Sequence, residues 1–497
     1  MPIVLITALG AFLRFFHLGH QGLWYDETFS AWLVNLPLGR MLGQLPIQES
    51  TPPLYYGVAW FWTRIFGDTT LGLRSLSAVV GTATIPIAYA SARKLLPGRR
   101  PALILAALTA CNPFLIWYSQ EARAYEMLVF VSALTVLTFA YARERPRRLA
   151  LSLWAVACAA ALATEYYAVL VVIPQAIWLI YEHRHKRWLY AALGFIALIG
   201  AALVPLVIAQ NKTNHDAWIG HISLTLRLEQ VSPMFLLGPQ THLRILLKFI
   251  GFAVVLAAIV LLLFRSTRRE RQGALAAVIL GVGGFILSLL IIPASDTFLS
   301  RNIIDLWLPL AMIVAAGLGV ARARLIGAGL ALVLCAIGIT AVISVDTDYW
   351  FGRPNWQAVA TEMGSWPAPT SAHPKDVRLV LLQQNPGRLP LGLYMPNLNH
   401  IDTKTVPNVS EIYVIAINGT PKGLGSVCWW GSACNLVASR LKVNYGIPGF
   451  HNVRRFRIKQ FDVLELAADK PTTVSRRRLM RTLPHHPNPW NTLLIQK

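Results

Sequence analysis

Two adjacent carboxylates stand near the start of the chain, in the segment Leu23-Trp24-Tyr25-Asp26-Glu27-Thr28. A carboxylate is costly to place at the mouth of a membrane bundle, so its presence there calls for a reason. One reason is chemistry, because Asp26 or Glu27 could act as a general base that removes a proton from an acceptor hydroxyl. The other is local structure, because Asp26 could cap a helix that begins near Phe29. The spacing by itself favours the cap, and both interpretations stay open at this point.

Two later polar segments carry arginines between apolar runs. One is Trp117-Tyr118-Ser119-Gln120-Glu121-Ala122-Arg123-Ala124-Tyr125-Glu126, and the other is Ser295-Asp296-Thr297-Phe298-Leu299-Ser300-Arg301-Asn302. The planar guanidinium of Arg123 or Arg301 could hold a phosphate through two parallel hydrogen bonds. Alternatively, Glu121 and Arg123 form an ordinary ion pair in a solvated turn, and Arg301 extends toward lipid headgroups.

The elements that position these residues are predicted to be membrane-spanning helices. The chain has 497 residues, of which 55% are hydrophobic and 14% charged, whereas soluble domains are about a quarter charged. A spanning helix needs about 20 mostly apolar residues. We therefore predict a polytopic all-α transmembrane bundle of about eleven spans, with the N-terminus inside. The predicted spans are residues 3–18, 69–92, 101–118, 127–142, 149–164, 167–181, 188–208, 243–264, 273–293, 303–321 and 325–345.

The distribution of basic residues predicts the orientation of these spans. The net charge is +22, and the basic residues gather in short clusters between apolar runs. These clusters are residues 93–100, 143–148, 184–187, 265–271 and 322–324. The positive-inside bias places such clusters in the cytoplasm, which puts all three polar segments and the C-terminus on the outer face. Anionic lipid headgroups are then the expected partners of the positive charge, and nucleic acid is not.

Two further regions complete the predicted organisation. The outer loop 19–68 contains an amphipathic stretch, Thr28–Glu49, broken at Pro37, and the short apolar run Pro52–Phe66, which we interpret as juxtamembrane or re-entrant. Residues 346–497 follow the membrane domain 1–345 and contain strand-like runs, 377–382, 411–417 and 461–466, so they predict a small α/β or mixed domain outside the cytoplasm. In that compartment Cys428 and Cys434 could form a local disulfide.

Four segments in the first part of the chain resemble the GT-C membrane glycosyltransferases, which include the bacterial protein O-mannosyltransferases and the aminoarabinose transferases of lipid A. The segments are Leu23-Trp24-Tyr25-Asp26-Glu27, Thr51-Pro52-Pro53-Leu54-Tyr55-Tyr56, Leu73-Arg74-Ser75-Leu76-Ser77 and Tyr118-Ser119-Gln120-Glu121-Ala122-Arg123. Later, Arg353-Pro354-Asn355-Trp356 is similar to the segment after the last span of these proteins. The chain departs from the family pattern at Thr51 and Glu165, where many relatives have histidine, and at Asn302, where they tend to have tyrosine.

The resemblance implies a multi-pass enzyme of the plasma (inner) membrane that transfers a sugar with inversion. The donor would be a sugar on polyprenyl phosphate, and the acceptor a hydroxyl of a glycan, lipid or protein. Asp26 would be the general base, and Glu27 and Glu121 would orient a substrate or a divalent cation, whose involvement the sequence leaves open. Arg301 and Arg123 would hold the donor phosphate. Further substrate contacts are expected from Tyr55, Tyr56 and Tyr166.

A secondary transporter or lipid flippase is the rival class. It would also have many spans and ionisable groups, but transporters usually contain internal repeats and broken helices at the bilayer midplane. The sequence shows no such repeat, and its ionisable groups gather at one interface. A non-catalytic scaffold of the cell envelope would leave Asp26 and Glu27 unexplained.

The predicted topology can be tested by cysteine labelling in intact cells. A cysteine introduced near Asn418 should react with a membrane-impermeant reagent, and one introduced near Arg269 should not, because the basic cluster 265–271 is expected in the cytoplasm. The reverse labelling pattern would contradict the assigned orientation.

Overall fold

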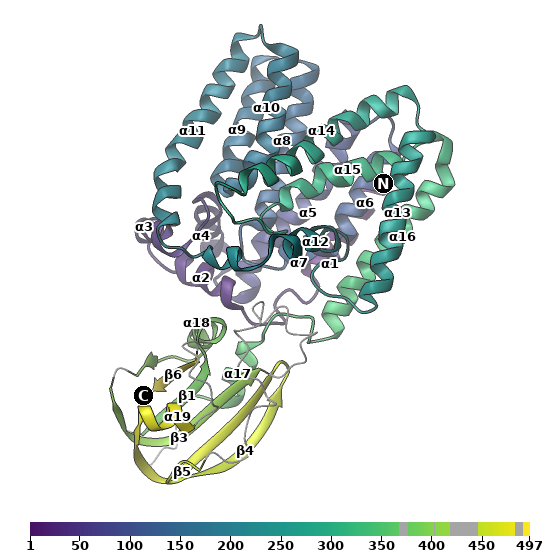
Figure 1. Cartoon of the computed structure of the whole chain (residues 1–497). Helices are drawn as coiled ribbons and strands as arrows, with labels where there is room; N and C mark the ends of the chain where they lie inside the picture. Colours follow the sequence, from purple (N-terminus) through teal and green to yellow (C-terminus); the bar gives the residue numbers. More distant parts are fainter. Residues whose placement is uncertain (367–375, 402, 418–445, 483–490) are drawn as a thin grey trace. The chain divides into compact units, whose positions relative to one another are not determined.

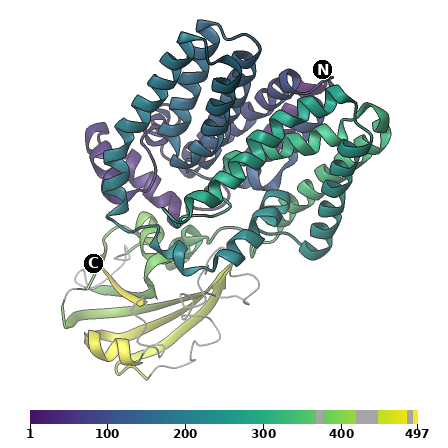
Figure 2. The same cartoon turned by 45° about the horizontal axis from the view of Figure 1, so that its top comes forward.

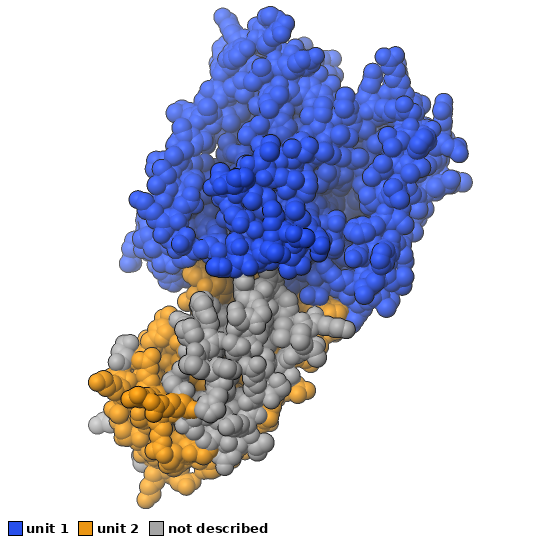
Figure 3. Space-filling view, viewed as in Figure 1, with its two compact units in different colours: residues 1–18, 30–344 blue, residues 19–29, 345–497 orange. Residues whose placement is uncertain are grey.

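The computed structural model describes residues 1–366, 376–401, 403–417, 446–482 and 491–497. The chain forms two compact units, which Figure 3 colours separately. Unit 1 consists of residues 1–18 and 30–344, and unit 2 consists of residues 19–29 and 345–497. The predicted disulfide between Cys428 and Cys434 lies outside the described residues.

Unit 1 is helical throughout (Figure 1). Its helices are α1 (Pro2–Phe15), α3 (Leu38–Gln48), α4 (Leu54–Phe66), α5 (Thr70–Leu95), α6 (Arg100–Cys111), α7 (Pro113–Ser119), α8 (Tyr125–Glu144), α9 (Arg148–Thr164), η1 (Tyr166–Ala168), α10 (Val169–His183), α11 (Arg187–Asn211), η2 (Ala217–His221), α12 (Leu224–Leu237), α13 (Arg244–Phe264), α14 (Arg268–Ile291), η3 (Ile304–Leu306), α15 (Trp307–Leu318), η4 (Ala321–Ala323) and α16 (Arg324–Thr347). Helix α2 (Tyr25–Val34) begins in unit 2 and ends in unit 1.

The multi-pass helical region is confirmed, and each of the eleven predicted spans contains a helix. Among the described residues, six helices are long and apolar enough to cross a membrane, and a seventh is obtained if the bent pair α6–α7 counts as one span. Three shorter apolar helices, Pro2–Phe15, Arg148–Thr164 and Ile304–Leu318, account for further predicted spans. The expectation of one continuous helix over 101–118 is wrong, because α6 and α7 meet at an angle of 54°.

The break between α6 and α7 has a local cause in Asn112 and Pro113. Pro113 has no N–H and cannot donate to the carbonyl of Thr109, four residues earlier. The Asn112 side chain instead accepts a hydrogen bond from the Leu115 N–H at 3.1 Å and starts α7 as its N-cap. The carbonyls at the end of α6 therefore need other donors.

Arg14 of α1 supplies those donors and is completely buried. Its guanidinium donates to the carbonyls of Thr109 at 3.0 Å and Ala110 at 3.1 Å, and its Nε donates to the Ser119 hydroxyl at 3.0 Å. In return, the Gln120 amide lies 3.0–3.3 Å from three carbonyl oxygens at the end of α1. The side chains of Arg14 and Gln120 thus provide hydrogen bonds to the backbone carbonyls at the ends of α6 and α1, as apolar surroundings require.

Unit 2 contains one six-stranded sheet in the order β2-β6-β1-β3-β5-β4. The strands are β1 (Val377–Gln383), β2 (Leu398–His400), β3 (Thr405–Ile417), β4 (Phe450–Ile458), β5 (Phe461–Ser475) and β6 (Asn491–Gln496). β1 and β3 pair in parallel, whereas every other neighbouring pair is antiparallel. The long strands β3, β5 and β4 are seen from two directions in Figures 1 and 2. The predicted mixed domain is therefore a mixed β-sheet with three helices: α17 (Trp356–Met363), α18 (Gln384–Tyr394) and α19 (Arg476–Thr482).

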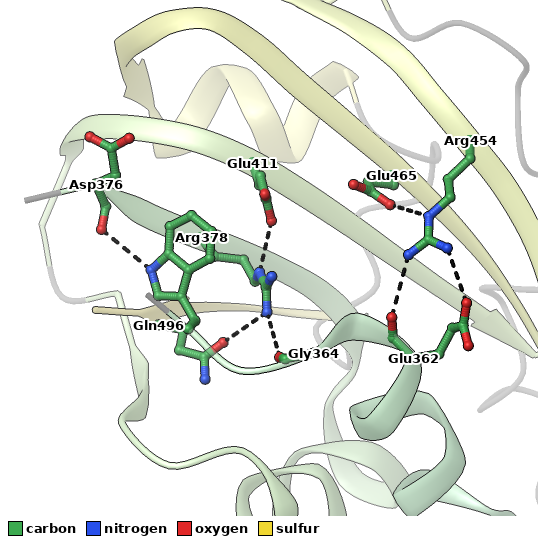
Figure 4. Close-up of polar contacts among 9 residues, drawn as sticks. Glu362, Gly364, Asp376, Arg378, Glu411, Arg454, Glu465 and Gln496 are labelled. Atoms are coloured by element: carbon green, nitrogen blue, oxygen red, sulfur yellow. Dashed lines mark hydrogen bonds and ion pairs between the residues drawn. The ribbon is translucent and has the colours of Figure 1, made fainter. Parts of the chain in front are cut away.

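Each face of the sheet has its own apolar core. Trp356 of α17 and Leu391 of α18 pack with Val380 on one face, and Leu479 of α19 packs with Leu466 on the other. Polar contacts also hold α17 against the sheet. Arg454 of β4 binds Glu465 of β5 at 2.6 Å and Glu362 of α17 at 3.0 Å (Figure 4).

Arg378 of β1 makes a second group of polar contacts in unit 2. It binds Glu411 of β3 at 3.0 Å and donates to the Gly364 carbonyl at 3.1 Å, just after α17 (Figure 4). Its guanidinium carbon also lies 4.6 Å from the ring centroid of Trp366. Helix α17 is thus fixed firmly to the sheet.

Replacing Arg14 with leucine should destabilise the protein by about 3–5 kcal/mol, because it leaves buried partners of a charged group without their donors. Thermal unfolding in detergent would measure the loss. Arg40→Leu is the matched control, since Arg40 is exposed on α3 and should change the unfolding temperature little. An Arg14→Leu protein as stable as the wild type would show that other donors replace the guanidinium.

Candidate active site

The carboxylates Asp26 and Glu27 lie in the first turn of α2. The helix begins at Tyr25, not near Phe29 as the capping alternative assumed. At the start of the helix, the Glu27 carboxylate accepts a hydrogen bond of 3.3 Å from the Trp24 N–H. Glu27 is fully buried, whereas Asp26 is partly exposed. Glu27 therefore has the local structural role that the sequence suggested for Asp26.

Arg123 lies in unit 1 between α7 and α8 and pairs with Glu49, just after α3. Its two terminal nitrogens bind the two carboxylate oxygens of Glu49 at 2.7 and 3.0 Å, and one of them also donates to the Tyr56 hydroxyl at 2.8 Å. Burial by itself lowers the pKa of Arg123, but Glu49, Tyr56 and Tyr125 together outweigh this effect and raise the pKa well above its usual value. The structure thus brings two predicted site residues together, Arg123 and Tyr56, through a carboxylate that the sequence did not single out.

The segment that carries Glu49 is held by the side chain of Gln210, at the end of α11. The Gln210 amide nitrogen donates to the carbonyls of Leu45 at 3.2 Å and Thr51 at 3.0 Å, on either side of Glu49. Its amide oxygen accepts from the hydroxyl of Tyr166 at 2.7 Å. The predicted site residue Tyr166 is therefore linked to Glu49 through Gln210. The only signal for Gln210 in the sequence is a polar residue at the end of an apolar run, which is too common to identify it.

Arg301 lies in the segment between α14 and η3. Its guanidinium carbon is 5.6 Å from the ring centroid of Tyr125 and 5.4 Å from that of Trp218, distances at which an aromatic face attracts a cation. Trp218 belongs to η2, in a segment that the sequence analysis did not assign to the site.

Two contacts from other helices fix the segment that carries Arg301. The buried Arg227 of α12 binds both carboxylate oxygens of Asp296, at 2.6 and 3.0 Å. The hydroxyls of Tyr167 and Thr297 lie 3.0 Å apart. The segment that carries the Arg301 guanidinium is therefore fixed to α12 and η1.

Glu165 stands where many relatives of the predicted family have histidine, and it is buried between α9 and η1. Its carboxylate accepts a hydrogen bond from the Tyr166 N–H at 3.0 Å. Burial raises its pKa to about 8, against the lowering effects of that hydrogen bond and of Arg123. Asp216 and Glu49 contribute to this rise, so Glu165 is largely protonated at neutral pH.

Glu121 and Tyr55, the remaining predicted site residues, are also buried in unit 1. The Glu121 carbonyl accepts from the Arg123 N–H at 2.9 Å, so its role in the backbone is to shape the turn that carries Arg123. Within the described part of the chain, no group of three or more His, Cys, Asp or Glu residues could hold a metal ion.

Comparisons with known proteins show what the chain is similar to. Residues 50–209 match the family model described as dolichyl-phosphate-mannose-protein mannosyltransferase. The fold matches that of ArnT from Cupriavidus metallidurans bound to undecaprenyl phosphate, with a TM-score of 0.55 and 13% identity, over 93% of this chain and 97% of that one. Apo ArnT from the same organism gives a TM-score of 0.54 with 14% identity and the same coverage.

A more distant likeness is to the oligosaccharyltransferase of Archaeoglobus fulgidus. It has a TM-score of 0.41 and 14% identity and covers 76% of this chain, but the chain spans only 56% of that protein's length. No curated protein sequence matches the chain.

The chain thus has an ArnT-like fold, and its residues 50–209 match a family of membrane glycosyltransferases. The family match concerns the segment 50–209, and the likeness to ArnT concerns the fold of 93% of the chain. The resemblance stated from the sequence is confirmed at this level.

The raised pKa of Glu165 predicts a pH-dependent loss of stability. Because the folded protein keeps the proton up to a pH of about 8, while an unfolded Glu loses it near 4.3, folding becomes less favourable as the pH rises between these values. Glu165→Gln removes this titration. The unfolding temperature of the variant relative to wild type should therefore rise from pH 5 to pH 8 and level off above. A difference that is constant from pH 5 to 9 would show that Glu165 is ionised when folded.

Proposed function

We propose that the protein is an inverting glycosyltransferase that moves a sugar from a polyprenyl-phosphate donor to a hydroxyl acceptor on the outer face of the membrane. The acceptor hydroxyl belongs to a glycan, a lipid or a protein. Asp26 is the general base of the reaction.

The observation that carries this proposal is the different environment of the two adjacent carboxylates. Glu27 is buried and bonded to the Trp24 N–H at the start of α2. Asp26 is partly exposed in the same helical turn. An accessible carboxylate held on a rigid helix suits proton transfer, because a general base must be within hydrogen-bond reach of the proton it removes.

Two comparisons support a lipid-phosphate donor. The matched family is described by a dolichyl-phosphate sugar, and the ArnT structure of similar fold was obtained with undecaprenyl phosphate. Both are polyprenyl phosphates, and a helical membrane protein can receive such a lipid directly from the bilayer.

The mechanism needs one displacement. Asp26 takes the proton of the acceptor hydroxyl as its oxygen attacks the anomeric carbon from the face opposite the phosphate, which inverts the configuration. The bond to the phosphate oxygen breaks at the same time, and the phosphate leaves with its electron pair. Because this phosphate leaves as an anion, the reaction requires a positive group near it more than a strong acid.

Arg301 is the better of the two candidates for that positive group. The charge of Arg123 is already offset by the two oxygens of Glu49. The guanidinium carbon of Arg301 lies 5.6 Å from the ring centroid of Tyr125 and 5.4 Å from that of Trp218, and aromatic faces at this distance favour a positive charge. Arg123 then serves the site by ordering Tyr56 and the turn beside Glu121. No step of this mechanism passes through a metal ion.

Asp26→Asn tests the base, because it keeps the size of the side chain but cannot accept a proton. General bases contribute about 10²–10⁴-fold to rate, so sugar transfer from a radiolabelled polyprenyl-phosphate donor should fall by that factor while donor binding persists. Glu27→Gln is the matched variant, since its amide oxygen can still accept the Trp24 N–H.

Transfer by Asp26→Asn at the wild-type rate would exclude Asp26 as the base. An inactive Glu27→Gln beside an active Asp26→Asn would move the role to the other carboxylate of the pair.

A further inference from the structure

We propose that the C-terminal domain positions the catalytic base, through Tyr394 and the backbone at Arg353. This inference rests on the proposed function, because it takes Asp26 as the base. It assigns a catalytic purpose to a domain that carries none of the predicted catalytic residues.

The segment before Asp26 packs with the C-terminal domain in unit 2. The hydroxyl of Tyr394, the last residue of α18, accepts a hydrogen bond of 2.7 Å from the Leu23 N–H. Leu23 itself is buried and stands three residues before Asp26. A displacement of this contact would therefore be transmitted directly to the first turn of α2.

A second attachment lies two residues earlier, at Gln21. Its side-chain oxygen accepts the Arg353 N–H at 3.0 Å, and the carbonyl of Arg353 accepts from the buried amide of Gln460 at 3.2 Å. Gln460 sits in the turn between β4 and β5. The segment is thus linked to the sheet through two consecutive hydrogen-bonded contacts.

Gly22, between these two attachments, is in close contact with the domain. A Cβ placed on Gly22 would lie 2.7 Å from the Cβ of Gln357 on α17 and 3.0 Å from the Tyr394 hydroxyl. Such a contact is too short for the neighbours to stay in place. Because α17 is fixed to the sheet by Glu362 and Arg454, the segment rather than the domain would have to move.

Tyr394 and Arg353 are therefore positioning residues, which act on the reaction only through Asp26. A rigid support of this kind matters because a base that is about 1 Å out of place can cost about 10²-fold in rate. The donor phosphate, which is assigned to Arg301, should bind equally well with or without it.

Two small changes test the inference in the full-length protein. Tyr394→Phe removes one hydroxyl and should lower kcat about fivefold, which corresponds to the loss of one hydrogen bond. Gly22→Ala adds one methyl group at the contact and should lower kcat by about tenfold to hundredfold. In both variants KM for the polyprenyl-phosphate donor should stay within about twofold of the wild type, and the unfolding temperature should change little.

Matched controls come from the same chain. Tyr349→Phe changes a partly exposed tyrosine of the same domain, and Gly57→Ala adds a methyl group in α4 where nothing lies within 4 Å. Both controls should keep the wild-type kcat.

The outcomes separate this inference from the proposed function. Wild-type kcat in Tyr394→Phe and Gly22→Ala, with an inactive Asp26→Asn, would overturn the positioning role and leave the proposed function intact. A raised donor KM with unchanged kcat would also overturn it, because the contact would then serve donor binding. If Asp26→Asn transfers sugar normally, both proposals fail together.

Discussion

Backbone groups inside a membrane must find their hydrogen bonds within the protein, and in unit 1 this requirement is met by Arg14. Pro113 breaks the span formed by α6 and α7, and the carbonyls released at the end of α6 accept the guanidinium of Arg14. A break of this kind is tolerated in hydrocarbon only where other groups satisfy the freed backbone. The same contacts fix the end of α7, and therefore the turn in which Glu121 and Arg123 lie.

The buried charges of unit 1 follow a second rule, that each charge is paired or neutralised when it leaves water. Arg123 is paired with Glu49 and Arg227 with Asp296, each through two hydrogen bonds. Glu165 instead has a raised pKa and keeps its proton. The guanidinium carbon of Arg301 lies near the faces of Tyr125 and Trp218, at distances where an aromatic ring attracts a cation.

The residues proposed for the reaction belong to both units. Arg301, which we propose holds the donor phosphate, lies in unit 1, and Asp26 lies in unit 2 with the C-terminal sheet. Helix α2 begins in unit 2 and ends in unit 1. Within unit 2, a hydrogen bond joins Leu23 to Tyr394, although more than 300 residues separate them along the chain.

The sequence by itself determined the features that depend on local composition. Long apolar runs predicted the helices of the membrane region, short strand-like runs predicted strands β1, β3 and β5, and the short motifs around Asp26, Tyr56 and Arg123 indicated the GT-C class. The spacing of apolar residues and the backbone hydrogen bonds of a helix extend over only a few residues, so a short stretch of sequence is enough to predict these features.

Only the tertiary structure decided which polar groups meet. Glu49, Gln210 and Trp218 were not singled out, because each contacts a site residue at least 44 residues away along the chain. The hydrogen bond of Glu27 at the start of α2 was missed because it depends on where α2 begins and on how deeply the side chain is buried. Long-range contacts and burial arise from packing, and neighbouring residues in the chain carry no record of them.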